Sequence, residues 1–279
     1  MRCSRILLQV MKGKQEITIQ HPEAWELLVS LQGKRVRYIL FTPAVANSLH
    51  IDEVECAEES LQGLEDAVLN TPVLLDDYKR VRVVVYPQHF VLFPQEVFDE
   101  DCTALLREAF PADDGDAAVS LMPQNGVKVA YLLPRGIQAF VGRTFNYPVV
   151  FPHLVPLGEH FKSLVRSDDR KRLLLHLADN RTDLAVYEGD KLMCLNSYPF
   201  INGADVTYFT LGAWRSQSLD QLKDELQIMG DNELQSKILP TLREYVKNVM
   251  TAVYPAAAMR LGRNAMQAPL ELILLALCE

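Results

Sequence analysis

Residues 173–200, LLLHLADNRTDLAVYEGDKLMCLNSYPF, contain three apolar runs that are joined by two short polar turns. The first turn is Ala178–Thr182, and the second contains Gly189, which can adopt a positive φ. Short apolar runs bounded by such turns are typical of paired strands. The stretch therefore predicts a three-strand meander over residues 172–178, 183–188 and 192–198.

The chain after this meander alternates between helical and strand patterns. The segments are a helix at 206–214, a strand at 225–229, a helix at 234–249, a strand at 251–254 and a helix at 270–278. Pro240 is expected to kink the second of these helices, and the last helix is apolar nearly all round, which is typical of a buried helix. The order β-β-β-α-β-α-β-α implies a mixed sheet with helices on its faces.

The first half of the chain gives a looser copy of this order. Predicted strands lie near 6–10, 16–20, 36–41, 81–86 and 127–133, and predicted helices lie at 60–69, 101–110 and 135–145. Ser60 is placed to cap the first of these helices. Prolines at 148, 152 and 156 mark a connection between the halves, so we divide the chain into domains at 1–164 and 165–279.

Composition indicates an acidic, soluble, globular protein. A chain of 279 residues is long enough for two domains, and its formal net charge of -8 repels phosphate backbones, so we expect no nucleic-acid partner. The five cysteines are scattered without a C-x-x-C pair, which indicates neither a disulfide framework nor a zinc site. We expect no targeting signal and no membrane span, because no apolar stretch approaches roughly 20 residues. These features predict a cytoplasmic protein.

Two stretches carry a resemblance to a known family. LMCLNSYPFINGADVTYFTLGAWRSQ (192–217) and ELQIMGDNELQSKILPTLREYV (225–246) resemble an uncharacterised bacterial family of unknown function that is assigned to the actin-like ATPase superfamily. The pattern is carried by Asn196, Tyr198, Phe200, Asp205, Tyr208 and Gly230. The resemblance implies an α/β fold of two ribonuclease-H-like domains, each with a mixed five-stranded sheet flanked by helices. Distant relatives include pilus-assembly and secretion domains and sugar kinases.

The resemblance also implies where a nucleotide would bind. Nucleotide-binding members of the superfamily hold ATP and magnesium with two Asp- and Gly-containing hairpin turns and with a Gly-Gly turn beside the base. The corresponding candidates are Lys12, Gly13 and Lys14 in the first hairpin, Asp179, Asn180 and Thr182 in the second, and Gly230 and Asp231 in the third turn.

All three candidate turns depart from the superfamily pattern. The first has a Gly but no Asp, the second has Asn180 where backbone access needs Gly, and the third has Asp231 in place of the second Gly. These departures predict a vestigial nucleotide cleft that has lost ordinary ATP and magnesium binding. We therefore expect no cofactor.

No other constellation in the sequence points to catalysis or to a metal site. The six histidines form no H-E-x-x-H pair, and we interpret them as surface or hydrogen-bonded side chains. Tyr198 and Tyr208 can line an interdomain cleft, although core packing is the simpler interpretation of this aromatic cluster. No catalytic residue is predicted.

Three classes of function remain open at this point. The leading hypothesis is a non-catalytic interaction or assembly module with an unknown protein partner. The alternative is a divergent ATP-binding ATPase or small-molecule kinase that acts in the interdomain cleft through Asp179, Thr182 and Gly230. A small-ligand sensor that uses the same cleft is the third. The sequence leaves the partner and the oligomeric state open, and it favours a non-enzyme.

Overall fold

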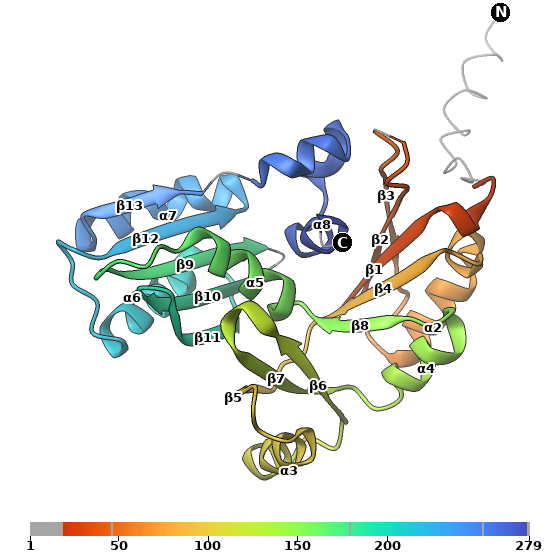
Figure 1. The fold of residues 1–279 in the computed structure, drawn as a ribbon, viewed down its shortest axis with the longest axis horizontal. Helices are drawn as coiled ribbons and strands as arrows, with labels where there is room; N and C mark the ends of the chain where they lie inside the picture. The colour runs from red at the N-terminus through yellow and green to blue at the C-terminus, as the bar shows by residue number, and fades with distance from the viewer. Residues whose placement is uncertain (1–18, 46, 179, 253, 278–279) are drawn as a thin grey trace, which may run out of the picture.

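Two five-stranded sheets form the body of the molecule. The computed structural model describes residues 19–45, 47–178, 180–252 and 254–277. The strand order is β3-β2-β1-β4-β8 in the first sheet and β11-β10-β9-β12-β13 in the second. Figure 1 shows the first sheet at the right and the second at the left, with helices around both. The predicted α/β class with two mixed five-stranded sheets is confirmed.

The first sheet is built around β1, which runs antiparallel to β2 and parallel to β4. Its strands are β1 (Glu26–Gln32), β2 (Arg35–Phe41), β3 (His50–Glu55), β4 (Arg80–Val85) and β8 (Val149–Pro152). The predicted strands near 6–10 and 16–20 fall outside the described residues, except for Ile19 and Gln20, which are not in a strand. The central strand β1 was not predicted.

The second sheet repeats this topology, because β9 runs antiparallel to β10 and parallel to β12. Its strands are β9 (Lys171–Ala178), β10 (Arg181–Glu188), β11 (Lys191–Pro199), β12 (Glu225–Gly230) and β13 (Asn248–Thr251). The meander predicted from residues 173–200 is confirmed as β9, β10 and β11.

One helix follows the third strand of each meander. These helices are α2 (Leu61–Leu69) and α6 (Gly203–Ser216), and each begins at a side-chain cap. The Ser60 Oγ accepts from the Gly63 amide at 3.0 Å, as predicted, while Asn202 and Asp205 form a capping box. α7 (Asn232–Tyr245) then connects β12 to β13 and contains Pro240, while the kink expected there stays a prediction.

Two helices cross between the halves. α5 (Leu154–Leu164) follows β8 of the first sheet but packs against β10 and β11 of the second. α8 (Leu270–Leu277) follows the second sheet but packs against β1 and β4 of the first, where it is buried as predicted. α5 and α8 also contact each other near the centre of the molecule. The division at residues 164 and 165 stays a prediction, and these two helices join the halves across it.

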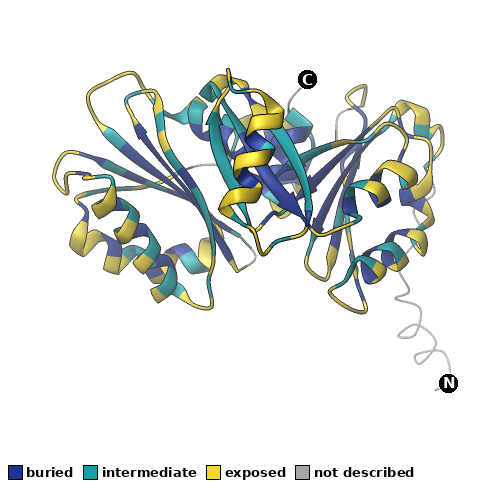
Figure 2. Ribbon diagram, turned by 90° about the horizontal axis from the view of Figure 1, so that it is seen from below, coloured by how far each residue is buried: buried dark blue, intermediate teal, exposed yellow. Residues whose placement is uncertain are grey.

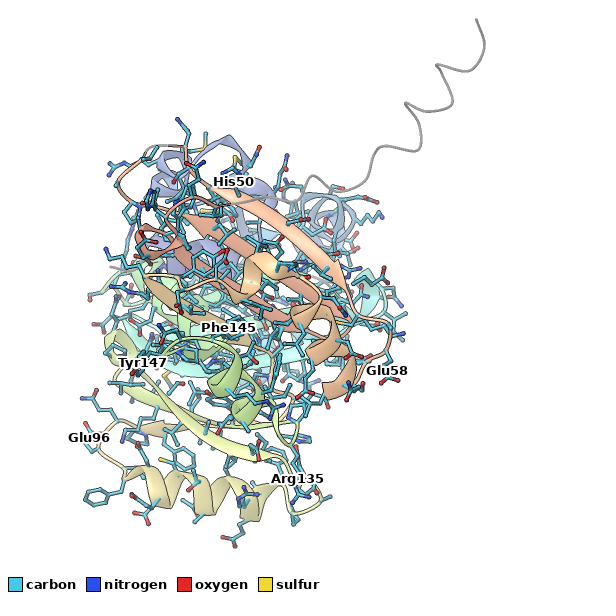
Figure 3. All side chains as sticks on the ribbon, turned by 90° about the vertical axis from the view of Figure 1, so that its right-hand side faces the viewer. His50, Glu58, Glu96, Arg135, Phe145 and Tyr147 are labelled. Atoms are coloured by element: carbon cyan, nitrogen blue, oxygen red, sulfur yellow. The ribbon has the colours of Figure 1, made fainter. Side chains whose placement is uncertain are left out.

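The chain between β4 and β8 forms a separate three-stranded sheet of order β5-β7-β6. Its elements are β5 (Phe90–Pro94), α3 (Asp99–Ala109), β6 (Asp116–Met122), β7 (Val127–Leu133) and the following α4 (Ile137–Thr144). The strand predicted at 127–133 is therefore real but lies in this sheet, because it pairs with β5 and β6 rather than with β4. Figure 3 shows this part from outside, with Glu96 and Arg135 toward its two ends.

Short 3-10 helices complete the chain: Pro22–Ala24, Pro72–Leu75, Pro123–Asn125, Ala256–Arg260 and Arg263–Gln267. Burial follows the layers, since the central strands β1, β2, β4, β9 and β10 are largely buried, the edge strands are less so, and the outer helices expose one face (Figure 2). Over the described residues, no helix has the length and apolar character that crossing a membrane requires.

Candidate functional site

A cleft of about 920 Å³ lies between the two halves, and both central hairpins reach it. In the first hairpin Gln32 pairs with Arg35, which leaves Gly33 and Lys34 as a two-residue turn. In the second hairpin Ala178 pairs with Arg181 in the same way. Gly33, Lys34, Asn180 and Arg181 all line the cleft.

The first hairpin differs from the predicted one. Lys12, Gly13 and Lys14 lie outside the described residues, and the turn that occupies the expected place in the fold is Gly33-Lys34. Two apolar runs separated by a Gly-containing pair were the available signal for this hairpin. Gly33 has a φ of +54°, and a Cβ atom built on it would lie 3.5 Å from Oε1 of Glu59. A carboxylate of the chain itself therefore lies beside this turn.

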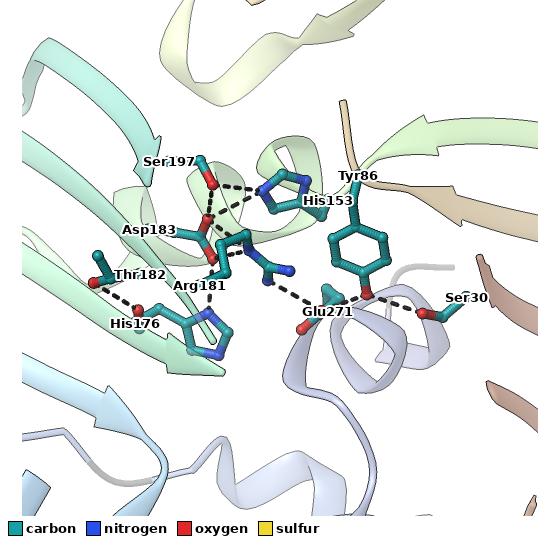
Figure 4. Close-up of polar contacts among 9 residues, drawn as sticks. All are labelled: Ser30, Tyr86, His153, His176, Arg181, Thr182, Asp183, Ser197 and Glu271. Atoms are coloured by element: carbon teal, nitrogen blue, oxygen red, sulfur yellow. Dashed lines mark hydrogen bonds and ion pairs between the residues drawn. The ribbon is translucent and has the colours of Figure 1, made fainter. Parts of the chain in front are cut away.

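The second hairpin places the charged side chain of Arg181 in the interior of the molecule. Arg181 is only 8% exposed, and its Nε lies 2.9 Å and 3.1 Å from the two Asp183 oxygens. Its Nη2 lies 3.4 Å from Oε1 of Glu271, which comes from α8 (Figure 4). The guanidinium thus bridges a carboxylate of the second sheet and a carboxylate on the helix that packs against the first.

Asp183 is the acceptor at the centre of this cluster. Besides Arg181, it lies 3.0 Å from Nε2 of His153, 3.1 Å from Nδ1 of His176 and 2.6 Å from Oγ of Ser197. Burial alone raises the pKa of this carboxyl, but Arg181 and His153 hold it well below its ordinary value. Asp183 is therefore an ionised side chain whose two oxygens are occupied by donors.

Residues of the first half complete the cluster on its other side. The Tyr86 hydroxyl donates to Oε1 of Glu271 at 2.5 Å and lies 3.0 Å from Oγ of Ser30. The Tyr86 ring stacks on His153 at 4.9 Å and lies under the Arg181 guanidinium at 4.5 Å. Burial raises the pKa of Tyr86 well above its ordinary value, so the hydroxyl remains a donor. The cluster joins β1, β4, α8 and the second sheet.

Two other predicted site residues, Asn180 and Thr182, have roles in the backbone structure of the second hairpin. Asn180 has a φ of 59° at the tip of the second hairpin, while the hydroxyl of Thr182 donates to the His176 carbonyl at 3.3 Å. Thr182 is fully buried and does not line the cleft. Asp179 lies outside the described residues.

The third turn starts a helix and does not line the cleft. Gly230 has a φ of +100°, and a Cβ atom there would lie 2.0 Å from the Leu177 carbonyl oxygen. The Asp231 side chain caps α7, since its Oδ1 accepts from the amides of Glu233 and Leu234 at 2.8 Å and 3.0 Å. The replacement of the second Gly by Asp therefore has a structural role in this chain.

Tyr198 and Tyr208 lie away from the cleft. Tyr198 stacks on Phe209 of α6 at 4.4 Å, and Tyr208 is 73% exposed. The aromatic residue that lines the cleft is Tyr86, which sequence reasoning missed. It also missed Glu271, although one acid in an otherwise apolar helix signals a buried charge that needs a partner.

Within the described ranges, no three or more His, Cys, Asp or Glu side chains are grouped so that they could hold a metal ion. The polar part of the site is a buried, hydrogen-bonded ion cluster at one end of the cleft. The other end has an apolar wall and the exposed turn Gly33-Lys34.

Comparison with known proteins identifies both the fold and the family. A solved protein from Bacteroides thetaiotaomicron, with an actin-like ATPase fold and unknown function, is 18% identical; the match covers 95% of this chain and 100% of that chain with a TM-score of 0.77. A PilM-PilN type IV pilus biogenesis complex matches at 13% identity, over 92% of this chain and 100% of that chain, with a TM-score of 0.49. The AlfA filament from B. subtilis matches at 6% identity, over 91% and 99% of the two chains, with a TM-score of 0.45.

No curated protein is significantly similar to the chain in sequence. The family model described as "Protein of unknown function (DUF3822)" matches residues 14–249, which is most of the chain. The similarity to the Bacteroides protein shows an actin-like ATPase fold. The chain therefore belongs to the DUF3822 family of unknown function, and its fold is that of the actin-like ATPases.

Proposed function

We propose that this chain is a non-catalytic interaction or assembly module on an actin-like ATPase fold, in which ordinary ATP binding has been lost. The observation that carries the proposal is the inward, buried Arg181 of the second hairpin. Its guanidinium contacts Asp183 and Glu271 at the end of the cleft where the fold presents a hairpin turn.

Magnesium–ATP fits these residues poorly. To hold a hydrated cation, Asp183 would have to give up contacts with Arg181, His153, His176 and Ser197, and each of those buried groups would then lack a partner. At the first hairpin, the Glu59 carboxylate beside Gly33 would repel a phosphate. No step of a phosphoryl transfer is derived from this arrangement.

Exposed apolar side chains support a role in protein interaction. Ile201, just before the cap of α6, is 92% exposed, Tyr208 within α6 is 73% exposed, and Met193 is 40% exposed on the edge strand β11. A protein partner would remove such exposed apolar side chains from water. The free thiols of Cys56, Cys102 and Cys194 support a reducing, cytoplasmic location.

Thermal unfolding of the full chain with millimolar magnesium–ATP tests the loss of nucleotide binding. A ligand at about 100 times its Kd stabilises a protein by roughly 2.7 kcal/mol, which raises Tm by several degrees. We expect no shift. A shift of several degrees in the natural chain that disappears in Lys34→Ala would overturn the proposal.

Photo-crosslinking in the native host tests the interaction role. A crosslinking amino acid at position 201 should give a discrete adduct, while the same amino acid at position 105, which is 49% exposed on α3, should not. If position 201 gives no adduct, the surface at the start of α6 does not bind a protein.

A divergent ATPase or small-molecule kinase is the second candidate. The exposed Lys34 in a Gly-containing turn of the cleft favours it, because a Gly–Lys turn offers backbone amides and an ammonium group to a phosphate. The thermal experiment with Lys34→Ala separates this candidate from the first.

A further inference from the structure

The buried end of the cleft presents two polar atoms that lack a partner. Nη1 of Arg181 and Nδ1 of His153 have no hydrogen-bond partner among the described residues. Both residues line the cleft, and they are 8% and 0% exposed. A buried polar atom without a partner is unfavourable, so this end of the cleft favours an occupant that pairs with both atoms.

The two atoms have complementary hydrogen-bonding roles. A guanidinium only donates. Nε2 of His153 lies 3.0 Å from the Asp183 carboxylate, so the ring proton belongs on Nε2 and Nδ1 is left as an acceptor. Burial lowers the pKa of His153, which keeps the ring neutral. The cleft therefore offers one donor and one acceptor, on two residues that both pack against the Tyr86 ring.

The surrounding charges disfavour an anion at this position. Arg181 carries one positive charge and already contacts two carboxylates, Asp183 and Glu271. A ligand carboxylate or phosphate on Nη1 would add a third negative charge to this buried cluster. A neutral group satisfies the same donor without that repulsion.

The rest of the cleft suits an apolar body. Its lining includes the apolar side chains of Leu61, Leu64, Leu132, Leu133 and Ile137. The volume of about 920 Å³ falls within the range of roughly 300–1,000 Å³ that small-molecule sites occupy. An apolar wall with a few convergent polar groups is typical of such sites.

We propose that the cleft binds a neutral small molecule with an apolar body and a primary carboxamide head. The carbonyl of the head accepts from Nη1 of Arg181, and its amino group donates to Nδ1 of His153. The apolar body lies against the leucines of α2 and β7. This inference goes beyond the proposed interaction role, which requires no ligand.

A series of probes with one body and three heads tests the proposal on the full, natural chain. The probes are 2-naphthamide, 2-naphthoate and 2-naphthylmethylamine, and calorimetry with naphthalene fluorescence measures each Kd. We expect the amide to bind at least tenfold more tightly than either charged probe. Equal or tighter binding of the naphthoate, or no saturable binding of the amide, would overturn the proposal.

A variant in the apolar wall then places the bound probe. Leu61→Asp puts a charge in the cleft at the first position of α2, where an acid is favourable to the helix, so the chain should fold. It should weaken 2-naphthamide at least tenfold, while Leu105→Asp on the exposed face of α3 should not. An unchanged Kd in Leu61→Asp would place the probe elsewhere. A parallel magnesium–ATP titration keeps the two proposals apart, since ATP binding contradicts the loss of nucleotide binding alone.

Discussion

The two central hairpins have the same backbone pairing, but the first arginine after each turn has different contacts. Each has a two-residue turn, and Arg35 and Arg181 occupy the same register position after it. The Arg35 side chain is 53% exposed, with its Nε 4.0 Å from Glu53, whereas the Arg181 side chain is 9% exposed. The difference arises because α8 and Tyr86 reach over the second hairpin and supply Glu271 and an aromatic face.

The two hairpins also differ two residues further along the second strand. Arg37 of β2 lies across from Glu53 of β3 and pairs with it, while Asp183 of β10 lies across from Ser197 of β11. Equivalent positions of the two sheets thus carry opposite charges. The Arg37 side chain is 12% exposed and pairs with Glu53 of the same sheet, whereas Asp183 is fully buried and also contacts Arg181, His153 and His176.

Removing the buried arginine should have the largest effect. Arg181→Met leaves Asp183 and Glu271 buried without their shared cation, so we expect a loss of about 3–5 kcal/mol in the free energy of unfolding. The matched variant Arg35→Met should cost less than about 1 kcal/mol, because exposed ion pairs contribute little. Urea denaturation of both variants measures the difference. Similar costs at the two positions would mean that the second hairpin does not depend on its ion cluster.

Substitutions of the turn glycines should have the next largest effect, and the loss of stability should differ between the two turns. Gly230→Ala should destabilise the chain by about 2–3 kcal/mol, because φ is +100° and the new Cβ would meet the Leu177 carbonyl oxygen at 2.0 Å. Gly33→Ala should cost about 1 kcal/mol, since its φ of +54° is accessible at a smaller penalty and nothing lies closer than 3.5 Å. Thermal unfolding of the two variants tests this order, and a reversal would contradict the close approach of β9 and β12.

Most of the second half could be predicted from sequence, and the first half only in part. The runs of residues 173–200 carry their own turns, so local pattern alone places β9, β10 and β11. β1 was not predicted, because the apolar runs of residues 6–20 also fit the leading strands, although Gly33-Lys34 between apolar runs is an equally clear hairpin signal. The strand at 127–133 was predicted correctly as a strand. Its pairing partners could not be predicted, because tertiary contacts decide them and sequence periodicity does not report those contacts.

The candidate site depends still more on such contacts. Arg181 directly follows the second turn, and its partner Glu271 is 90 residues away on a helix that crosses between the halves. The Tyr86–Glu271 contact spans 185 residues. No local pattern links these positions, so the ion cluster appears only when the two halves are packed together.

Acid should destabilise the region around the second hairpin at a higher pH than the region around the first hairpin. Burial lowers the pKa of His160 to about 4 and lowers that of His153 as well. An unfolded histidine titrates near about 6.5, so below that pH the unfolded state binds protons that the folded state does not, and stability falls. For His160 the loss amounts to about 1 kcal/mol between pH 6.5 and 5.5, and His153 adds to the same slope.

Unfolding free energies measured from pH 7 to pH 4.5 test this slope. His160→Gln should flatten the curve, because it removes a ring whose pKa is lowered by burial. Asp183 and Glu271, whose pKa values are lowered, lose their contribution only at pH values below about 4. A curve for His160→Gln that parallels the natural one would show that this ring is not held neutral.

The smallest effect is expected at the turn after β12, where a negative charge replaces the superfamily's second glycine. Asp231→Ala removes the cap of α7 and should cost about 0.5–1 kcal/mol, while Asp231→Asn keeps the hydrogen bonds to Glu233 and Leu234 and should be nearly neutral. Chemical denaturation of the two variants separates capping from charge. If the Asn and Ala variants lose the same stability, the charge at the helix N-terminus matters more than the cap.

Asp231→Gly tests whether the third turn excludes a nucleotide, because it restores the Gly-Gly pair that the superfamily places beside the base. Arg181 still holds Asp183 in this variant, so the second hairpin is unchanged and we expect no stabilisation by magnesium–ATP. A Tm rise of several degrees in Asp231→Gly would show that the third turn, and not the ion cluster of the second hairpin, is what separates this chain from nucleotide-binding relatives. Combining the change with Arg181→Gly would then be uninformative, since the cluster would already be dispensable for excluding the nucleotide.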